Sequence, residues 1–127
     1  MRLRPLRGVA SLALLGILVS TPSTLRAHHG WGGYSSQEFQ LTGTVEQPVS
    51  LAGPHGTMKI RVEQQVWDIT LAPPARVSAA GLREDTIPSG ATVTIHGHRS
   101  NDRRRFEVKT ERVVYNGKTF NVYPDRK

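Results

Sequence analysis

Hydrophobic and polar residues alternate along most of the chain after residue 38. In the first such segment, Phe39, Leu41 and Val45 alternate with polar residues. A period of two places successive side chains on opposite faces of a strand, so the segment predicts a strand with one buried face. The same alternation recurs further along the chain and predicts strands over residues 39–46, 58–62, 67–71, 92–98, 106–115 and 118–123.

The breaks between these segments carry turn and helix signals. Pro48 is expected to end the first strand, because proline has no backbone N–H to donate to a sheet. Pro73 and Pro74 stop the third strand, and the residues after them predict a short helix over 75–80 that ends at Gly81. Asn116-Gly117 is the strongest hairpin signal in the chain.

The order of the elements predicts the fold class. Three strands, a short helix and two further strands, with an added hairpin return, match a small all-β Greek-key barrel of the OB (oligonucleotide/oligosaccharide-binding) type. In that barrel the helix lies between strands three and four. A generic antiparallel sandwich is the alternative. Fold class alone does not indicate function.

The first 27 residues have the pattern of an export signal. A basic start is followed by an apolar run over 8–19, and small residues lead to Ala27. The run is shorter than the roughly 20 residues that a membrane-spanning helix needs. We therefore expect cleavage after Ala27, with an earlier cut near Ser23 or an uncleaved anchor as alternatives. The predicted organisation is a signal peptide (1–27), a flexible arm (28–38), a barrel domain (39–123) and a tail (124–127), in a periplasmic or secreted protein.

Composition narrows the classes of function. Without the leader's four arginines, the formal charge falls from +7 to +3, which does not call for a nucleic-acid partner. The chain has no cysteine, so it has neither a disulfide nor a thiolate ligand. We expect no nucleic-acid partner and no stable membrane span once the signal is removed. The expected partners are a metal ion or a periplasmic protein.

The chain's five histidines occur in three places. They are His28 with His29, His55, and His96 with His98. In an OB barrel, the loop between strands one and two and the loop between strands four and five lie on the same side. His55 lies in the first loop and His98 at the start of the second, and the glycine-rich arm could bring His28 to the same end. His96 and His98 are two apart on a strand and share one face.

This arrangement predicts a metal site. After cleavage, His28 would offer both its α-amine and its imidazole, and further imidazoles would complete a planar set of nitrogen donors. Such a set favours copper(II), with zinc as the second choice. Asp102 could supply an oxygen beside the site. We expect Trp31 to anchor the arm and Trp67 to belong to the core or to pack under the barrel mouth.

The alternative for each histidine, taken singly, is a structural or surface role. His28 and His29 could belong to a solvated tail, and the role of His55 could be limited to shaping a turn. The chain has no HExxH helix, no paired-carboxylate spacing and no serine–histidine–acid motif, so we expect no catalytic residue. The one enzymatic alternative is an oxidative copper activity, which an N-terminal histidine would permit.

Several motifs along the mature chain resemble an uncharacterised family of small exported proteins from Gram-negative bacteria. Members of that family have Ala-His-His-Ser/Gly-aromatic after the signal, then Gly-x-Val, Asn-Pro-His, a tryptophan and Gly-Asp-x-Val-x-Val-x-Gly. The matching residues are Ala27-His28-His29-Gly30-Trp31, Leu41-Thr42-Gly43-Thr44-Val45, Gly53-Pro54-His55, Trp67, Gly81-Leu82, Ile87-Pro88-Ser89-Gly90 and Val93-Thr94-Ile95-His96-Gly97-His98-Arg99-Ser100.

The resemblance implies a periplasmic OB-like domain and no assigned activity. It singles out His28, His29, His55 and His98, whereas His96 is not part of the pattern. The chain departs from the pattern at Gly53 and Ala91, which stand where the family has Asn and Asp.

Two functions therefore stand side by side. The first is a periplasmic carrier or accessory factor with a histidine-based metal site at the barrel mouth. The second is a metal-free envelope module that uses the barrel mouth to bind a small ligand or a partner protein.

Overall fold

The computed structural model describes residues 30–126. The predicted signal peptide and the predicted ligands His28 and His29 lie outside the described residues. The elements are β1 (Phe39–Ser50), β2 (Thr57–Val62), β3 (Gln65–Thr70), α1 (Pro74–Ala79), β4 (Thr92–Arg99), β5 (Glu107–Tyr115) and β6 (Lys118–Asn121). Within residues 30–126, no helix has the length and apolar character needed to cross a membrane.

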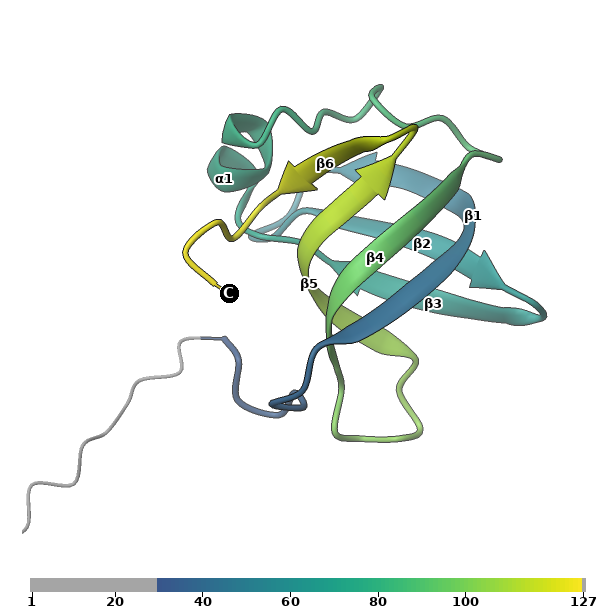
Figure 1. The fold of residues 1–127 in the computed structure, drawn as a ribbon, viewed down its shortest axis with the longest axis vertical. Helices are drawn as coiled ribbons and strands as arrows, with labels where there is room; N and C mark the ends of the chain where they lie inside the picture. The colour runs from purple at the N-terminus through teal and green to yellow at the C-terminus, as the bar shows by residue number, and fades with distance from the viewer. Residues whose placement is uncertain (1–29, 127) are drawn as a thin grey trace, which may run out of the picture.

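Five of the strands close into a barrel (Figure 1). β1 pairs with β2 on one side and with β4 on the other, and both pairings are antiparallel. A parallel pairing between β3 and β5, in which Ile69 is opposite Val108, closes the barrel, and β6 stays outside it. β6 extends β5 as an antiparallel hairpin, and α1 lies between β3 and β4 in the chain. The predicted OB-like all-β class is confirmed.

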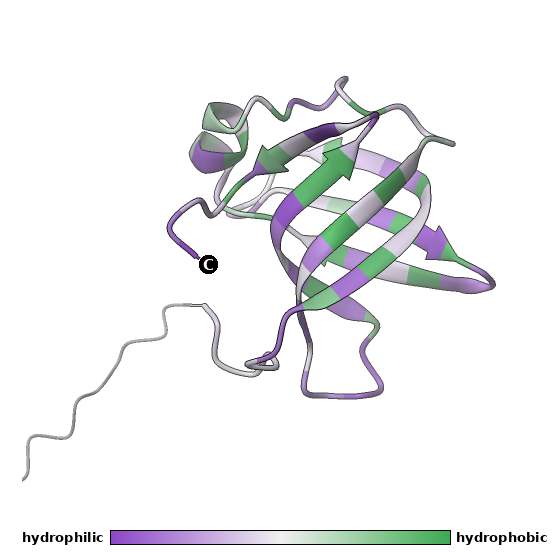
Figure 2. Ribbon diagram, in the orientation of Figure 1, coloured by the Kyte–Doolittle hydropathy of each residue, from purple (hydrophilic) through white to green (hydrophobic). Residues whose placement is uncertain are grey.

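The alternating pattern fills the barrel interior. Figure 2 shows hydrophobic and hydrophilic residues taking turns along the strands. Ile60, Ile69, Ile95 and Val113 come from four different strands and are at most 1% exposed. Burying a side chain of this size stabilises the fold by roughly 1.5–3 kcal/mol, so the interior supplies the main driving force for folding.

β1 is longer than the sequence predicts, because it continues through Pro48 to Ser50. The ladder between β1 and β4 ends at Thr44, so the proline does not interrupt it. On the other side, the register with β2 shifts between Val45 and Gln47 and again between Gln47 and Ser50. Proline is tolerated at such irregular positions.

Two tight turns set the register of the hairpins. Glu63 has a φ of 54° in the turn between β2 and β3. Asn116 and Gly117, with φ of 51° and 75°, join β5 to β6. Positive φ at both central residues is typical of the type I′ hairpin turn that Asn-Gly predicts.

A bulge in β5 gives this strand an unusual outer face. His96 pairs with Arg112 and the next residue, Gly97, pairs with Thr110, so Glu111 is an extra residue with no partner in the ladder. Glu107 and Lys109 alternate with inward-facing residues before the bulge, and both are buried although they are charged. Segments outside the barrel shield the side chains of Glu107 and Lys109 from solvent.

The N-terminal arm provides much of this cover. The Ser35 N–H donates to the Arg99 carbonyl at 2.9 Å, and the Asn101 N–H donates to the Gly33 carbonyl at 2.8 Å. Tyr34 forms an isolated antiparallel bridge with Ser100. The arm and the C-terminal tail lie on the same side of the barrel in Figure 1. The described part of the predicted arm thus lies against the sheet.

Gly97→Ala tests the close approach of β4 and β5 at the bulge. A Cβ at this position would lie 2.2 Å from the Lys109 carbonyl oxygen, so one of the two strands would have to move. We expect the variant to lose about 3 kcal/mol of unfolding free energy in urea titrations.

Gly53→Ala is the matched control, because its Cβ would lie 3.5 Å from the nearest atom, the His55 carbonyl oxygen. It should change stability by less than about 0.5 kcal/mol. Equal stability of the two variants would contradict the described register.

Candidate functional site

A buried ion pair between His98 of β4 and Glu111 of β5 joins the barrel to the arm. The His98 Nε2 atom lies 2.7 Å from Glu111 Oε1, and both side chains are at most 7% exposed. The other ring nitrogen, Nδ1, lies 2.8 Å from the backbone carbonyl oxygen of Ser35. Both nitrogens of His98 therefore lie within hydrogen-bond distance of oxygen atoms.

The glutamate of this pair is held in its charged form. Burial alone would raise the pKa of Glu111. Hydrogen bonds from Arg126 and His98, together with the positive charges of both, outweigh that effect and lower its pKa below the usual 4.5. Arg126 Nε donates to Glu111 Oε1 at 2.9 Å, so the carboxylate also binds the C-terminal tail.

Trp31 covers the ion pair. Its ring meets His98 edge-on with centroids 5.4 Å apart, and it meets Tyr123 in the same way at 5.1 Å. The guanidinium carbon of Arg126 lies 3.9 Å from the Trp31 ring centroid. Trp31 thus contacts two strands of the barrel, through His98 and Lys109, and the last described residues, through Tyr123 and Arg126.

Lys109 lies beside His98 in the same buried layer. It is 4% exposed, and it is opposite His98 on β4 and Thr70 on β3. Its ammonium nitrogen lies 5.4 Å from the Trp31 ring centroid and would be 3.0 Å from a Cβ placed on Gly30. Burial lowers the pKa of Lys109, and the nearby Glu107 carboxylate only partly opposes that shift.

His55 lies in a different element from His98. It is half-buried in the loop between β1 and β2. Burial lowers the pKa of His55, and the positive charge of Lys109 lowers it further. Thr57, two residues on, is opposite Thr70 on β3. Three strand spacings of about 4.8 Å thus separate Thr57 from His98 along the curved sheet.

His96 points from the same face of β4 as His98 but has different partners. Its Nδ1 lies 3.4 Å from an Arg112 nitrogen and 3.9 Å from a Glu38 oxygen. Among residues 30–126, no three histidine, cysteine, aspartate or glutamate side chains are grouped closely enough to hold a metal ion. The three described histidines are thus not brought together.

The other predicted site residues lie in the loop between β4 and β5 and at the barrel end beside it. Asp102 accepts hydrogen bonds from Arg104 at 3.1 and 3.3 Å, and these bonds lower the pKa of the aspartate. Trp67 is 6% exposed and belongs to the core, as predicted. Because His28 and His29 lie outside the described residues, the metal site stays a prediction.

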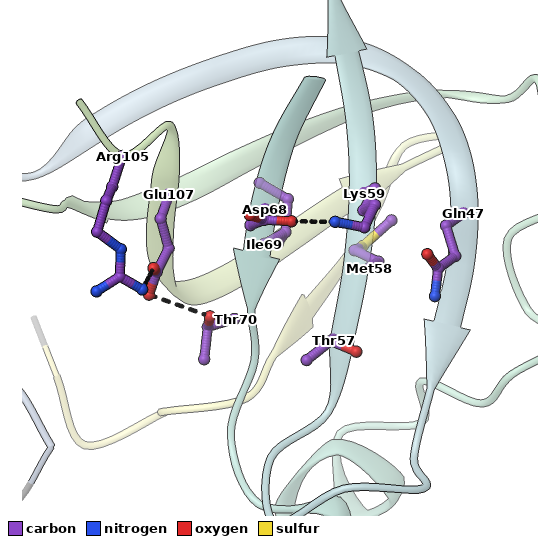
Figure 3. Close-up of a pocket in the computed structure, with 9 residues that line it drawn as sticks. All are labelled: Gln47, Thr57, Met58, Lys59, Asp68, Ile69, Thr70, Arg105 and Glu107. Carbon is purple, nitrogen blue, oxygen red and sulfur yellow. Dashed lines mark hydrogen bonds and ion pairs between the residues drawn. The ribbon is translucent and has the colours of Figure 1, made fainter. Parts of the chain in front are cut away.

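A polar pocket of about 300 Å³, which the sequence pattern does not predict, lies on the outer face of β2 and β3 (Figure 3). Two ion pairs line it, Lys59 with Asp68 and Arg105 with Glu107. The loop between β4 and β5 supplies Arg105, so the pocket spans the strands and the loop that bind ligands in OB folds.

Glu107 binds several polar side chains around this pocket. Besides Arg105, it accepts hydrogen bonds from the hydroxyls of Tyr34 and Thr70. Burial and the hydrogen bond to Glu107 raise the pKa of Tyr34 to about 12. The signal that could have found this site is a charged residue at every second position of a strand, at 107, 109 and 111.

Comparison with known proteins identifies the family. The chain belongs to DUF6152, a family of unknown function, whose model matches residues 15–109. The expected membership of an uncharacterised family is thereby confirmed. No curated protein matches the sequence.

Similar solved structures include two of TiaS, and the first of them supports the fold alone. The crystal structure of a ZRD-deleted mutant of TiaS in complex with agmatine has a TM-score of 0.50 and 11% identity, over 68% of this chain and 26% of the TiaS chain. A structure of apo TiaS, described as tRNAIle2 agmatidine synthetase, has a TM-score of 0.45 and 15% identity, over 61% and 17% of the two chains. The chain thus spans about a quarter of the first of these proteins.

Glu111→Gln tests the buried ion pair through its pH dependence. A lowered pKa in the folded state contributes stability that is present above the unfolded value of 4.5 and is lost as pH falls through the folded value. The variant should lose about 3 kcal/mol at pH 7, and its deficit relative to wild type should shrink as pH falls towards 3.

The matched control is Glu63→Gln, which removes an exposed carboxylate in the turn between β2 and β3. It should follow the wild-type curve in urea unfolding measured from pH 7 to pH 3. A Glu111→Gln deficit that is constant over this range would argue against the charged pair.

Proposed function

We propose that the protein is an exported metal-binding protein that holds copper first, and zinc second, as a periplasmic carrier or accessory factor rather than a catalyst. Its ligands are the α-amine and imidazole of His28, with His29 and the imidazole of His55. The signal pattern of residues 1–27 supports export. Cleavage after Ala27 would also expose the α-amine of His28 as a ligand.

The anchoring of the arm carries this proposal. Trp31 is fixed on the sheet by His98 and Arg126, and Gly30 lies against Lys109. Lys109 is in turn close enough to His55 for its charge to act on that imidazole. In this proposal, the two histidines that precede Gly30 in the sequence reach the imidazole of His55.

The same geometry changes the roles of the remaining histidines. His98 engages both ring nitrogens in protein contacts, so binding a metal would break the contact that holds the arm. His96 already lies between Arg112 and Glu38. In this proposal, His98 positions the ligand-bearing arm and His96 is a surface residue.

The ligand chemistry favours copper(II). An amine and an imidazole of one residue form a chelate, and one or two further imidazoles give the planar nitrogen set that copper(II) prefers. Lys109 places a positive charge near the imidazole of His55, which opposes the binding of a cation there. A site with several nitrogen donors is therefore needed, because a single imidazole would not outweigh that repulsion.

The test is copper(II) and zinc(II) titration of protein that begins at His28, beside protein with one extra N-terminal residue. We expect the extension to weaken copper binding by about tenfold or more, because it removes the amine from its chelating position. His55→Gln should also weaken binding, and His96→Gln, the matched control, should not.

Equal and weak binding by both N-terminal forms would contradict the metal proposal. The second candidate would then be favoured, a metal-free module that binds a small polar ligand in the pocket of β2 and β3. The observation behind it is that the pocket presents both charges, through Lys59 with Asp68 and Arg105 with Glu107.

A further inference from the structure

A second pocket lies between the N-terminal arm and the loop that joins β4 to β5, and the proposed metal site does not use it. Its volume is about 250 Å³, and its walls include Ser35, Phe39, Arg99, Ser100 and Arg103. Backbone hydrogen bonds fix both walls, since the Ser35 N–H donates to the Arg99 carbonyl and the Asn101 N–H donates to the Gly33 carbonyl. The pocket is therefore preformed.

The charge of this pocket is positive. Arg99 has a fully buried Nε atom with no hydrogen-bond partner among the described residues. Neither Arg99 nor Arg103 takes part in an ion pair within residues 30–126. The carboxylate that lines the pocket, Glu38, is paired with Arg112. The guanidinium groups of Arg99 and Arg103 thus bring positive charge to the pocket without a carboxylate partner, and an oxyanion in the pocket would pair with that charge.

The two serines of the pocket add donors. The Ser35 hydroxyl oxygen accepts a hydrogen bond from the Gln37 N–H at 3.1 Å, and that of Ser100 accepts one from the Asp102 N–H at 3.3 Å. Because each hydroxyl oxygen acts as an acceptor there, its hydrogen can point elsewhere. Two guanidinium groups and two hydroxyls are suited to a phosphate group.

An apolar side chain stands beside these donors. Phe106, at the end of the same loop, is 37% exposed. No other large hydrophobic side chain among residues 30–126 is exposed. The guanidinium carbon of Arg99 lies 4.8 Å from the Trp67 ring centroid and 5.5 Å from that of Phe106. The charged and apolar parts of the surface are thus continuous.

We propose that this pocket binds a phosphate group presented by the headgroup of an anionic lipid, with Phe106 entering the interface next to it. The combination of unpaired arginine with an exposed aromatic ring favours a lipid over free phosphate, because a free ion would not use Phe106. Interfacial binding of this kind combines buried apolar area with attraction to anionic headgroups.

The test is sedimentation of the chain from residue 28 with vesicles of phosphatidylcholine alone or mixed with phosphatidylglycerol. Starting at residue 28 removes the predicted signal, whose apolar run would itself bind vesicles. We expect binding to the mixed vesicles only, and weaker binding at higher salt. Arg103→Gln should weaken it about fivefold, and Phe106→Ser should also weaken it.

Lys118→Gln is the matched control, because it removes an exposed positive charge at the other end of β5 and β6. It should bind as wild type does. Far-UV circular dichroism would establish that each variant is folded. Equal binding to both vesicle types, no binding to either, or no effect of Arg103→Gln would overturn the proposal.

A second experiment distinguishes a lipid headgroup from free phosphate as the source of the phosphate group. Inorganic phosphate is titrated against labelled protein, and the amide signals of Ser35 and Asn101 are followed by NMR. Shifts that Arg103→Gln abolishes, together with sedimentation by the mixed vesicles, support the lipid headgroup. The same shifts without any vesicle binding would overturn the lipid source and leave a site for a soluble phosphate.

Discussion

The buried contact between His98 and Glu111 is the interaction on which the rest of the outer surface depends. Glu111 is outside the strand ladder because of the bulge in β5, and it receives His98 from the barrel and Arg126 from the tail. His98 uses its second nitrogen to bind the Ser35 carbonyl. One buried carboxylate thus fixes both ends of the described chain to the sheet. Removing one partner of such a pair typically costs about 3–5 kcal/mol.

The docked arm connects two proposed sites that share no residue. Its residues Gly30 and Trp31 lie against Lys109, whose positive charge acts on the imidazole of His55. Its later part, around Ser35, forms a wall of the pocket that Arg99 and Arg103 also line. The barrel interior contributes to neither site. The family has no known function. Both proposed sites use the outer layer of arm and loops.

The sequence was sufficient to predict the barrel and insufficient for its outer layer. Alternation with a period of two depends on local residues, so the strands and the OB-like order could be predicted. The bulge at Glu111 depends on which residues of β4 and β5 face one another, which no local pattern reveals. His98 could be recognised as special, but its pairing with Glu111 and Ser35 could not. Pro48 was misleading, because its effect depends on where the ladder to β4 ends.

Amide hydrogen exchange of Ser35 and Asn101 tests most directly whether His98 holds the arm on the barrel. Both amides donate to backbone carbonyls across the arm–loop contact, and the Val45 amide donates to the Ala91 carbonyl within the barrel. This role of His98 predicts that all three amides are protected in wild type. In His98→Ala, Ser35 and Asn101 should exchange much faster while Val45 stays protected. Unprotected Ser35 and Asn101 amides in wild type, or protection unchanged in the variant, would contradict it.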